Sequence, residues 1–256
     1  MNNFYCCFKI AADLCILASK IIVFKKMKRM RTVSGISLKA NILMMLSYLC
    51  IYTDPLDWNS LSFWNVYNNL IKVAMVEYQI GLFLFIYYRF YKTYEKRDDK
   101  CSVWFIFIIS LLFGIFTSHK THKYYTSVLR GYQFKKRNFY SFWSILKNSG
   151  HCLNALSIIP QLVMTQESGS CEAATGRSII LQGTGNALML VYNICACYYT
   201  SNRLMYVFLG VVTLIINLDF MLIYYKSMMV NIESKMNVKV KKINEKVEKV
   251  KNYFRK

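Results

Sequence analysis

Ionisable side chains inside apolar stretches are the residues of this 256-residue chain best placed to do chemistry. Lys9 and Asp13 are four residues apart, so a helix would place them on one face, where they can pair. Lys20 follows seven residues later on roughly the same side. Two interpretations are open: a polar seam that lines a central cavity, or an internal salt bridge with lysines that extend toward the membrane surface. Five further ionisable groups lie in similar surroundings: Lys39, Asp54, Lys72, Glu77 and Asp219.

A proline–glutamine pair, Pro160 and Gln161, interrupts another apolar stretch. A proline in the middle of a helix removes a backbone hydrogen bond and kinks the helix. The freed carbonyl groups, together with the glutamine amide, predict a polar spot near the middle of the bilayer.

The reactive residues do not form an enzyme or metal pattern. The apolar stretches contain no Ser–His–Asp set, no paired carboxylates and no metal-ligand spacing. Cys195 and Cys197 have no histidine at zinc-finger spacing, so we interpret them as packing residues. Two of the three histidines, His119 and His122, lie in a loop-like segment, and His151 lies early in a later apolar stretch. We interpret the first two as solvated loop residues rather than as a lumenal proton sensor. We expect no catalysis, no cofactor and no bound metal.

The composition is typical of a polytopic membrane protein. Hydrophobic residues make up 55% of the chain and charged residues 18%, and several apolar stretches reach the length of about 20 residues that a membrane-spanning helix needs. The net charge of +20 would suggest nucleic acid in a soluble protein. Most of the excess lies between the apolar stretches, as in the cytosolic loops of membrane proteins. We therefore predict an all-α protein of the lipid membrane that binds no nucleic acid.

The apolar stretches predict a seven-span membrane domain at residues 1–226 and a basic cytosolic tail at 227–256. The Lys and Arg block at 25–31 follows the first span, which predicts a lumenal N-terminus. The insert at 119–139 is an exception, because it is basic and yet predicted to be lumenal. The predicted spans are approximately 7–24, 36–53, 63–91, 103–117, 140–164, 178–199 and 204–225.

The tail carries apolar residues at heptad spacing from Met236 to Phe254. Three interpretations stay open: a helix on an anionic cytosolic leaflet, a short coiled coil, and a partly helical solvated tail.

Ordered short matches across residues 9–226 resemble the KDEL-receptor family, which returns escaped residents to the endoplasmic reticulum. The matches include Asp13-Leu14, Gly35-Ile36-Ser37, Ile158 to Leu162 around the proline–glutamine pair, and Asp219-Phe220. The resemblance implies seven transmembrane helices in two three-helix repeats plus a linker helix, as in SWEET and PQ-loop transporters. It also implies structural polar residues at Asp13, Gln161, Glu172 and Asp219.

The positions that bind the signal depart from the family. The family holds the acidic end of a retrieval signal with three arginines. By the resemblance, the matching positions of this chain are Lys9, Ile51 and Asn186. A charge-assisted contact contributes about 1.5–3 kcal/mol, so two neutral replacements predict that tight, pH-switched binding is lost or altered. The resemblance assigns signal binding to Lys9, Tyr52, Asp54, Lys147 and Asn186. Other positions depart as well. The resemblance places Ser144 and Lys147 where the family has a glutamate and a tryptophan, Gly185 and Met189 where it has tyrosines, and Ile16 where it has a histidine.

The favoured hypothesis is a receptor of endoplasmic reticulum and Golgi membranes that retrieves lumenal proteins with C-terminal signals. Its cytosolic face would meet retrograde coat proteins, although the last residues of the tail lack lysine at the usual dilysine positions. One alternative is a small-solute carrier of the SWEET and PQ-loop type with a polar cavity around Lys9, Asp13, Gln161 and Asn186. Another is a non-binding scaffold that modulates trafficking.

Overall fold

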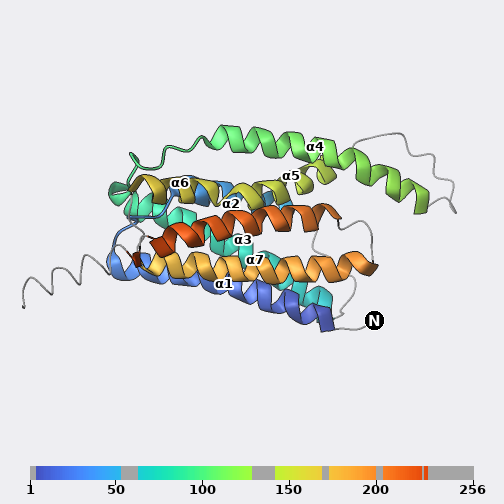
Figure 1. Ribbon diagram of the computed structural model, residues 1–256, viewed down its shortest axis with the longest axis horizontal. Coiled ribbons are helices and arrows are strands. Elements are labelled where there is room, and N and C mark those ends of the chain that lie inside the picture. Colours follow the sequence, from blue (N-terminus) through green and yellow to red (C-terminus); the bar gives the residue numbers. More distant parts are fainter. Residues whose placement is uncertain are drawn as a thin grey trace, which may run out of the picture.

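Helices make up the regular secondary structure of the computed structural model, which describes residues 4–52, 63–128, 142–168, 173–199, 204–226 and 228–229. The predicted all-α fold is confirmed for this part of the chain. The helices run side by side along one long axis, with α4 at the upper edge and α1 at the lower edge of the view (Figure 1). They are α1 (Phe4–Met30), α2 (Leu38–Ile51), α3 (Phe63–Phe85), α4 (Val103–Val128), α5 (Phe142–Leu156), α6 (Ile159–Ser168), α7 (Ala173–Tyr199) and the helix Leu204–Lys226, here called the 204–226 helix.

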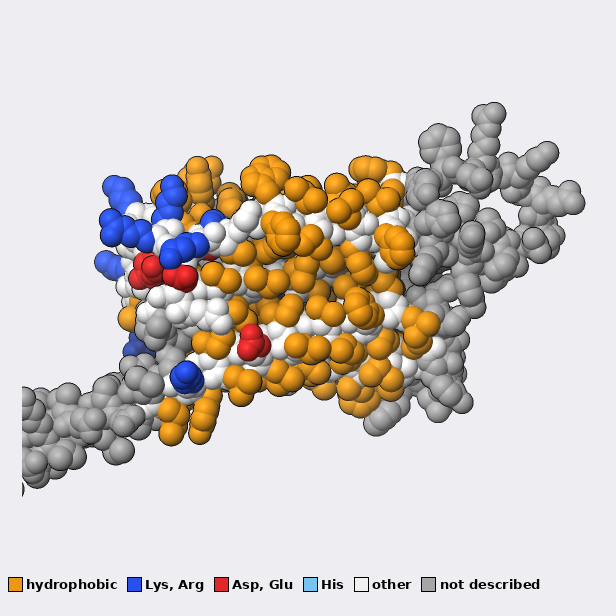
Figure 2. Space-filling model, turned by 45° about the horizontal axis from the view of Figure 1, so that its top comes forward, with side chains coloured by type: hydrophobic (Ala, Val, Ile, Leu, Met, Phe, Trp, Pro, Cys, Tyr) orange, Lys and Arg blue, Asp and Glu red, His pale blue; other side chains and the backbone are white. Residues whose placement is uncertain are grey.

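The surface has the pattern of a protein embedded in a bilayer. Among the described residues, three helical runs are long and apolar enough to cross a membrane: Phe63–Thr93, Thr175–Cys197 and Leu204–Lys226. Hydrophobic side chains form a broad band over the visible face, and Lys and Arg gather at one end (Figure 2). We call this the basic end; its exposed cations include Lys25, Lys28, Arg29, Arg31, Lys92, Lys96, Arg97 and Lys100. An apolar band beside a cationic end fits insertion with the cations at one membrane surface.

The run predicted as one span at 140–164 is two helices, which corrects the expected mid-helix kink. α5 ends at Leu156 and α6 begins at Ile159, so Pro160 is the second residue of a new helix. The first backbone N–H groups of a helix have no intrahelical acceptor, and a proline there removes no hydrogen bond. Pro160 therefore starts α6, and Gln161 lies in its first turn.

Two predicted segments fall largely outside the described residues. α4 continues past the predicted span end at 117 to Val128, and residues 129–141 of the insert region lie outside. Of the tail at 227–256, only 228–229 are described. The roles predicted for the insert and the tail stay predictions.

Two glycines allow helices to approach closely in the bundle. A Cβ added to Gly185 of α7 would lie 2.7 Å from Ile16 Cγ1 and 3.0 Å from the Ala12 carbonyl oxygen of α1. A Cβ added to Gly150 of α5 would lie 2.8 Å from Cys50 Cβ and 3.0 Å from the Ile51 nitrogen of α2. Small residues at helix contacts allow this backbone approach in membrane proteins, where packing rather than water exclusion holds helices together.

The connection between α1 and α2 turns sharply at the basic end. Arg31 (φ 53°) and Gly35 (φ 70°) have left-handed backbone conformations, the form that ends many helices and that glycine adopts without strain. Ser37 then caps α2, because its Oγ accepts the Ala40 N–H at 3.0 Å. The turn packs over a buried cluster of Met27, Val33, Ile36, Leu38, Leu82 and Ile86.

Candidate functional site

Lys9 and Asp13 both reach from α1 to the same stretch of α3. Lys9 Nζ donates a hydrogen bond to Asn68 Oδ1 and lies 5.2 Å from the ring centroid of Trp64 and 5.7 Å from that of Tyr67. The Tyr67 hydroxyl donates to Asp13 Oδ2 at 3.0 Å, and Asp13 is buried. We call these five residues the Lys9–Asp13 cluster. The spacing of four correctly placed Lys9 and Asp13 on one helix face, toward α3.

The other residues predicted to bind a signal lie on different helices. Tyr52 caps the C-terminal end of α2 and stacks on Tyr48, with ring centroids 5.8 Å apart. Asn186 is half-buried and follows Gly185, which packs against Ala12 to Ile16 of α1, so Asn186 lies on the α7 turn beside that part of α1. Lys147 is half-buried on α5. Asp54 lies outside the described residues. Whether the five residues predicted to bind a signal form one site therefore stays a prediction.

The four residues predicted to be structural polar groups are Asp13, Gln161, Glu172 and Asp219, and the three that the structure describes have different surroundings. Asp13 belongs to the Lys9–Asp13 cluster, and Gln161 is buried near the basic end. Asp219 is exposed on the 204–226 helix. Glu172 lies outside the described residues.

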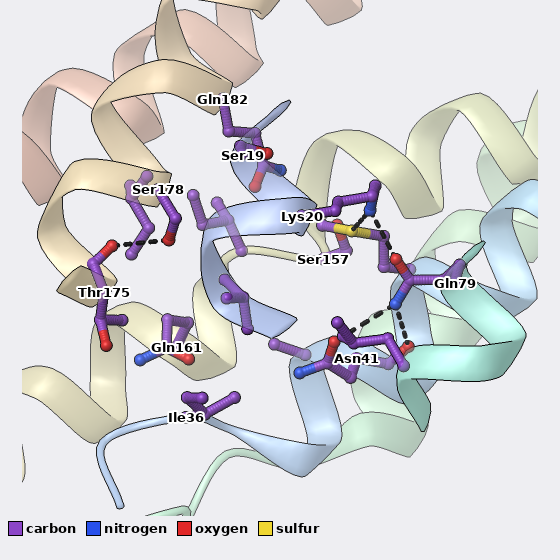
Figure 3. Close-up of a pocket in the computed structure, with 16 residues that line it drawn as sticks. Ser19, Lys20, Ile36, Asn41, Gln79, Ser157, Gln161, Thr175, Ser178 and Gln182 are labelled. Carbon is purple, nitrogen blue, oxygen red and sulfur yellow. Dashed lines mark hydrogen bonds between the residues drawn. The ribbon is translucent and has the colours of Figure 1, made fainter. Parts of the chain in front are cut away.

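A cavity of about 70 Å³ with several polar side chains in its lining lies inside the bundle, between residues of α1, α2, α3, α6 and α7 (Figure 3). A cavity needs about 10–15 Å³ to hold one water molecule, so this one has room for a few waters but not for a peptide. The cavity does not include Lys9, Tyr52, Lys147 or Asn186 in its lining. Its polar lining comprises Ser19, Lys20, Asn41, Gln79, Ser157, Gln161, Thr175, Ser178 and Gln182.

Lys20 places an ammonium group in this cavity among neutral partners. Its Nζ donates to Gln79 Oε1, lies 2.9 Å from Met44 Sδ and lies 4.8 Å from the ring centroid of Tyr48. Gln79, which is fully buried, donates in turn to the backbone oxygen and to Oδ1 of Asn41, both at 3.3 Å. No carboxylate among the described residues pairs with Lys20. The arrangement suits ordered water around a buried cation, whereas acid–base catalysis would need a titrating partner.

The sequence pointed to Lys20 but not to its partners. Lys20 stands out as a charge in an apolar run, whereas Gln79 and Asn41 are uncharged and gave no spacing signal. Their roles depend on α1, α2 and α3 meeting at one level, which Figure 3 shows at the dashed hydrogen bonds.

Gln161 joins α6 to the connection between α1 and α2. The Ser37 N–H donates to Gln161 Oε1 at 2.8 Å, and Gln161 Nε2 donates to the Gly35 carbonyl oxygen at 2.9 Å. The predicted polar spot therefore exists, but it lies beside the α1–α2 turn rather than midway along the bundle. Because the amide satisfies two backbone groups of the turn, its role here is structural.

The acidic residues after α3 hold the same turn from the other side. Ser34 Oγ donates to Glu95 Oε1 at 2.6 Å, and Ser37 Oγ donates to Asp99 Oδ2 at 2.7 Å. The Tyr94 hydroxyl also donates to Asp99 Oδ2, at 2.6 Å. Burial, and then the neighbouring Asp99 carboxylate, raises the pKa of the Tyr94 phenol. These acids, which the sequence analysis did not single out, connect the segment after α3 to the α1–α2 turn by hydrogen bonds.

Lys39, one of the charges singled out in an apolar stretch, also belongs to this network. Its Nζ donates to the backbone carbonyl oxygens of Asp99 and Cys101. Metal ligation has no support in the described ranges, which hold no group of three or more His, Cys, Asp or Glu side chains suited to a metal ion.

Comparison with known proteins gives a consistent result. The family model described as ER lumen protein retaining receptor matches residues 32–196. The chain is 25% identical over 219 residues to an ER lumen protein-retaining receptor of Caenorhabditis briggsae, covering 85% of this chain and 92% of the relative. It is 28% identical over 218 residues to ER lumen protein-retaining receptor 2 of Homo sapiens, with 85% and 92% covered. It is 27% identical over 227 residues to an ER lumen protein-retaining receptor of Dictyostelium discoideum, with 87% and 94% covered.

Proposed function

Since the chain belongs to the ER lumen protein-retaining receptor family, we propose that it is a membrane receptor that binds retrieval signals of lumenal proteins and returns them from the Golgi to the endoplasmic reticulum. The observation that carries the proposal is the extent of the match, which includes nearly the full length of the relatives. It is not an enzyme, because the family is one of receptors. The low identity agrees with a divergent member.

The proposed architecture is seven transmembrane helices in two three-helix repeats. α1, α2 and α3 would form one repeat, and α5 with α6, α7 and the 204–226 helix the other, with α4 as linker. The order and lengths of the helices support this assignment. The same proposal divides the chain into a membrane domain at residues 1–226 and a tail at residues 227–256.

We place the N-terminus in the lumen and the basic end in the cytosol. The end of α1, the exit of α3 and the end of the 204–226 helix carry exposed cations, and cytosolic segments of membrane proteins are enriched in Lys and Arg. Retrograde coat proteins would meet this end.

The signal would bind at the opposite end, near the Lys9–Asp13 cluster, with Tyr52, Asp54, Lys147 and Asn186 as the further proposed contacts. Lys9 supplies an ammonium beside aromatic rings and an amide, a setting that can receive a carboxylate. A lysine lacks the planar fork of arginine, so one carboxylate oxygen rather than two is expected to be held. This predicts weaker binding than three arginines would give.

The binding test uses the purified full chain in lipid nanodiscs and a fluorescent peptide ending in Lys-Asp-Glu-Leu. Saturable binding, measured across pH and absent for the same peptide with an amidated C-terminus, is expected. Lys9→Met should weaken binding by about tenfold or more, since a charge-assisted contact contributes about 1.5–3 kcal/mol. Lys28→Met, an exposed lysine of the basic end, is the matched control and should leave binding unchanged.

Failure to bind at any pH, by protein that remains folded and monodisperse, would reject the receptor proposal for this class of signal. Equal binding by Lys9→Met and Lys28→Met would retain the receptor but remove Lys9 from its site.

A further inference from the structure

The cavity inside the bundle contains a positive charge that no carboxylate of the described residues balances. Lys20 lies in its lining and is only 5% exposed. The ammonium group has three N–H donors, and its contacts are one amide oxygen of Gln79, the Met44 thioether at 2.9 Å and the ring of Tyr48. All three partners are neutral, and a thioether is a weak acceptor. A buried ammonium without a counter-charge is unfavourable, so this site calls for an anion.

The carboxylates that are buried among the described residues, those of Asp13 and Asp99, are engaged elsewhere. Asp13 accepts the Tyr67 hydroxyl at 3.0 Å, and it lies seven residues, or about 10 Å, before Lys20 on α1. Asp99 accepts two hydroxyl groups at the basic end, at 2.6 Å and 2.7 Å. Neither carboxylate lines the cavity. The counter-charge for Lys20 therefore has to come from outside the described chain.

The cavity has the size and the lining of a site for a small anion. Its volume of about 70 Å³ exceeds the 10–15 Å³ that one water molecule needs, and a halide ion is only slightly larger than water. Hydroxyl and amide groups, which can donate to an anion, surround Lys20 in the lining (Figure 3). Among them, Thr175 Oγ1 accepts Lys26 Nζ at 2.8 Å, so its own O–H can be directed into the cavity.

We propose that this cavity binds one chloride ion beside Lys20, as a buried counter-ion that stabilises the helical bundle. Lys20 supplies the opposite charge, and hydroxyl groups and ordered water in the cavity complete the surroundings of the ion. A divalent anion would bring a second charge that Lys20 cannot balance, so a monovalent ion is favoured. The volume excludes a large organic anion such as gluconate. Because the lining comes from α1, α2, α3, α6 and α7, the ion would hold these helices together.

The first experiment follows thermal unfolding of the purified full chain in detergent while chloride replaces gluconate at constant ionic strength. Mildly acidic pH keeps the Lys20 amine charged, and gluconate has the charge of chloride but not its size. A ligand that binds only the folded state stabilises it by an amount that grows with its concentration relative to Kd. The unfolding midpoint should therefore rise with chloride, by about 5–11 °C at a hundredfold excess over Kd. Bromide should replace chloride in this effect.

Two lysine variants separate this site from a general effect of the salt. Lys20→Met removes the charge and should unfold at the same temperature in chloride and in gluconate. Lys72→Met is the matched control, because Lys72 is a half-buried lysine of α3 outside the cavity lining, and it should keep the full chloride shift. The two salts are compared within each variant, so a general loss of stability in Lys20→Met does not affect the result.

Equilibrium dialysis of the wild type against radioactive chloride measures binding directly, and it gives a result even if Lys20→Met does not fold. A single saturable site per chain is expected, from which bromide displaces chloride and gluconate does not. The proposal is overturned if no chloride is retained, if the wild type unfolds identically in both salts, or if Lys20→Met keeps the chloride shift. None of the residues proposed to bind a retrieval signal lines the described cavity, so either proposal can fail alone.

Discussion

Replacing Gln161 by leucine should destabilise the fold by an amount that the structure allows us to work out. The side chain accepts the Ser37 N–H at 2.8 Å and donates to the Gly35 carbonyl at 2.9 Å. Ser37 is fully buried and Gln161 is 7% exposed, so water cannot easily replace the amide. Leucine has a similar size but neither donor nor acceptor. An orphaned buried polar group costs about 1–3 kcal/mol, so losing both partners should lower the free energy of unfolding by about 2–6 kcal/mol.

Thermal unfolding of the purified full chain in detergent, followed by the loss of the monodisperse size-exclusion peak, measures this effect. At about 2–4 °C per kcal/mol, the midpoint of Gln161→Leu should fall by about 4–24 °C. Gln161→Glu keeps the acceptor but places a buried carboxylate against the Gly35 carbonyl oxygen, so it should destabilise the fold as well. Gln182→Leu is the matched control, because Gln182 lines the same cavity without a hydrogen bond to the described residues. If Gln161→Leu melts with the wild type, or if Gln182→Leu loses as much, the reasoning is refuted.

Three further outcomes test the packing and electrostatics. Gln79→Leu removes the only oxygen acceptor seen for Lys20 among the described residues, so the free energy of unfolding should fall by about 1.5–3 kcal/mol. Adding Lys20→Met should restore part of this loss, as a double-mutant cycle of thermal unfolding can measure. Gly150→Ala should cost about 1–3 kcal/mol in the same melts because its Cβ would come within 2.8 Å of α2, whereas Gly81→Ala should be neutral or stabilising. The raised pKa of Tyr94 favours the neutral phenol in the folded state, so stability should decline as pH rises above about 10, and less steeply in Tyr94→Phe, when melts are compared across that range.

The helices were the most predictable part of the fold. Apolar stretches of helical length marked most of the described helices, because burial of apolar surface in membrane or core acts residue by residue. The exception is the end of α4, which continues to Val128 through residues that were predicted as part of the basic insert. Helix ends were less predictable. Pro160 suggested a kink inside one helix, whereas it begins α6, because proline is compatible with both arrangements and the choice depends on what the break packs against.

The candidate site was predictable only for its charged members. Lys9, Asp13 and Lys20 attracted notice because charge in an apolar run is costly, and the four-residue spacing correctly put the first two on one face. No local pattern separated Lys20 from them. In the structure Lys20 turns to Gln79 on α3, in a cavity that Lys9 and Asp13 do not line.

The sequence by itself determined that the chain is helical and apolar, with charge confined to the ends of its helices and to a few positions within them, because hydropathy and helix periodicity are local properties. The ordered matches along the chain also identified its family. Only the tertiary structure decided which polar groups satisfy one another. Gln161 bonds to Ser37, 124 residues away, and Lys20 bonds to Gln79, 59 residues away. Such pairs depend on how helices are placed around one another, which no local pattern specifies.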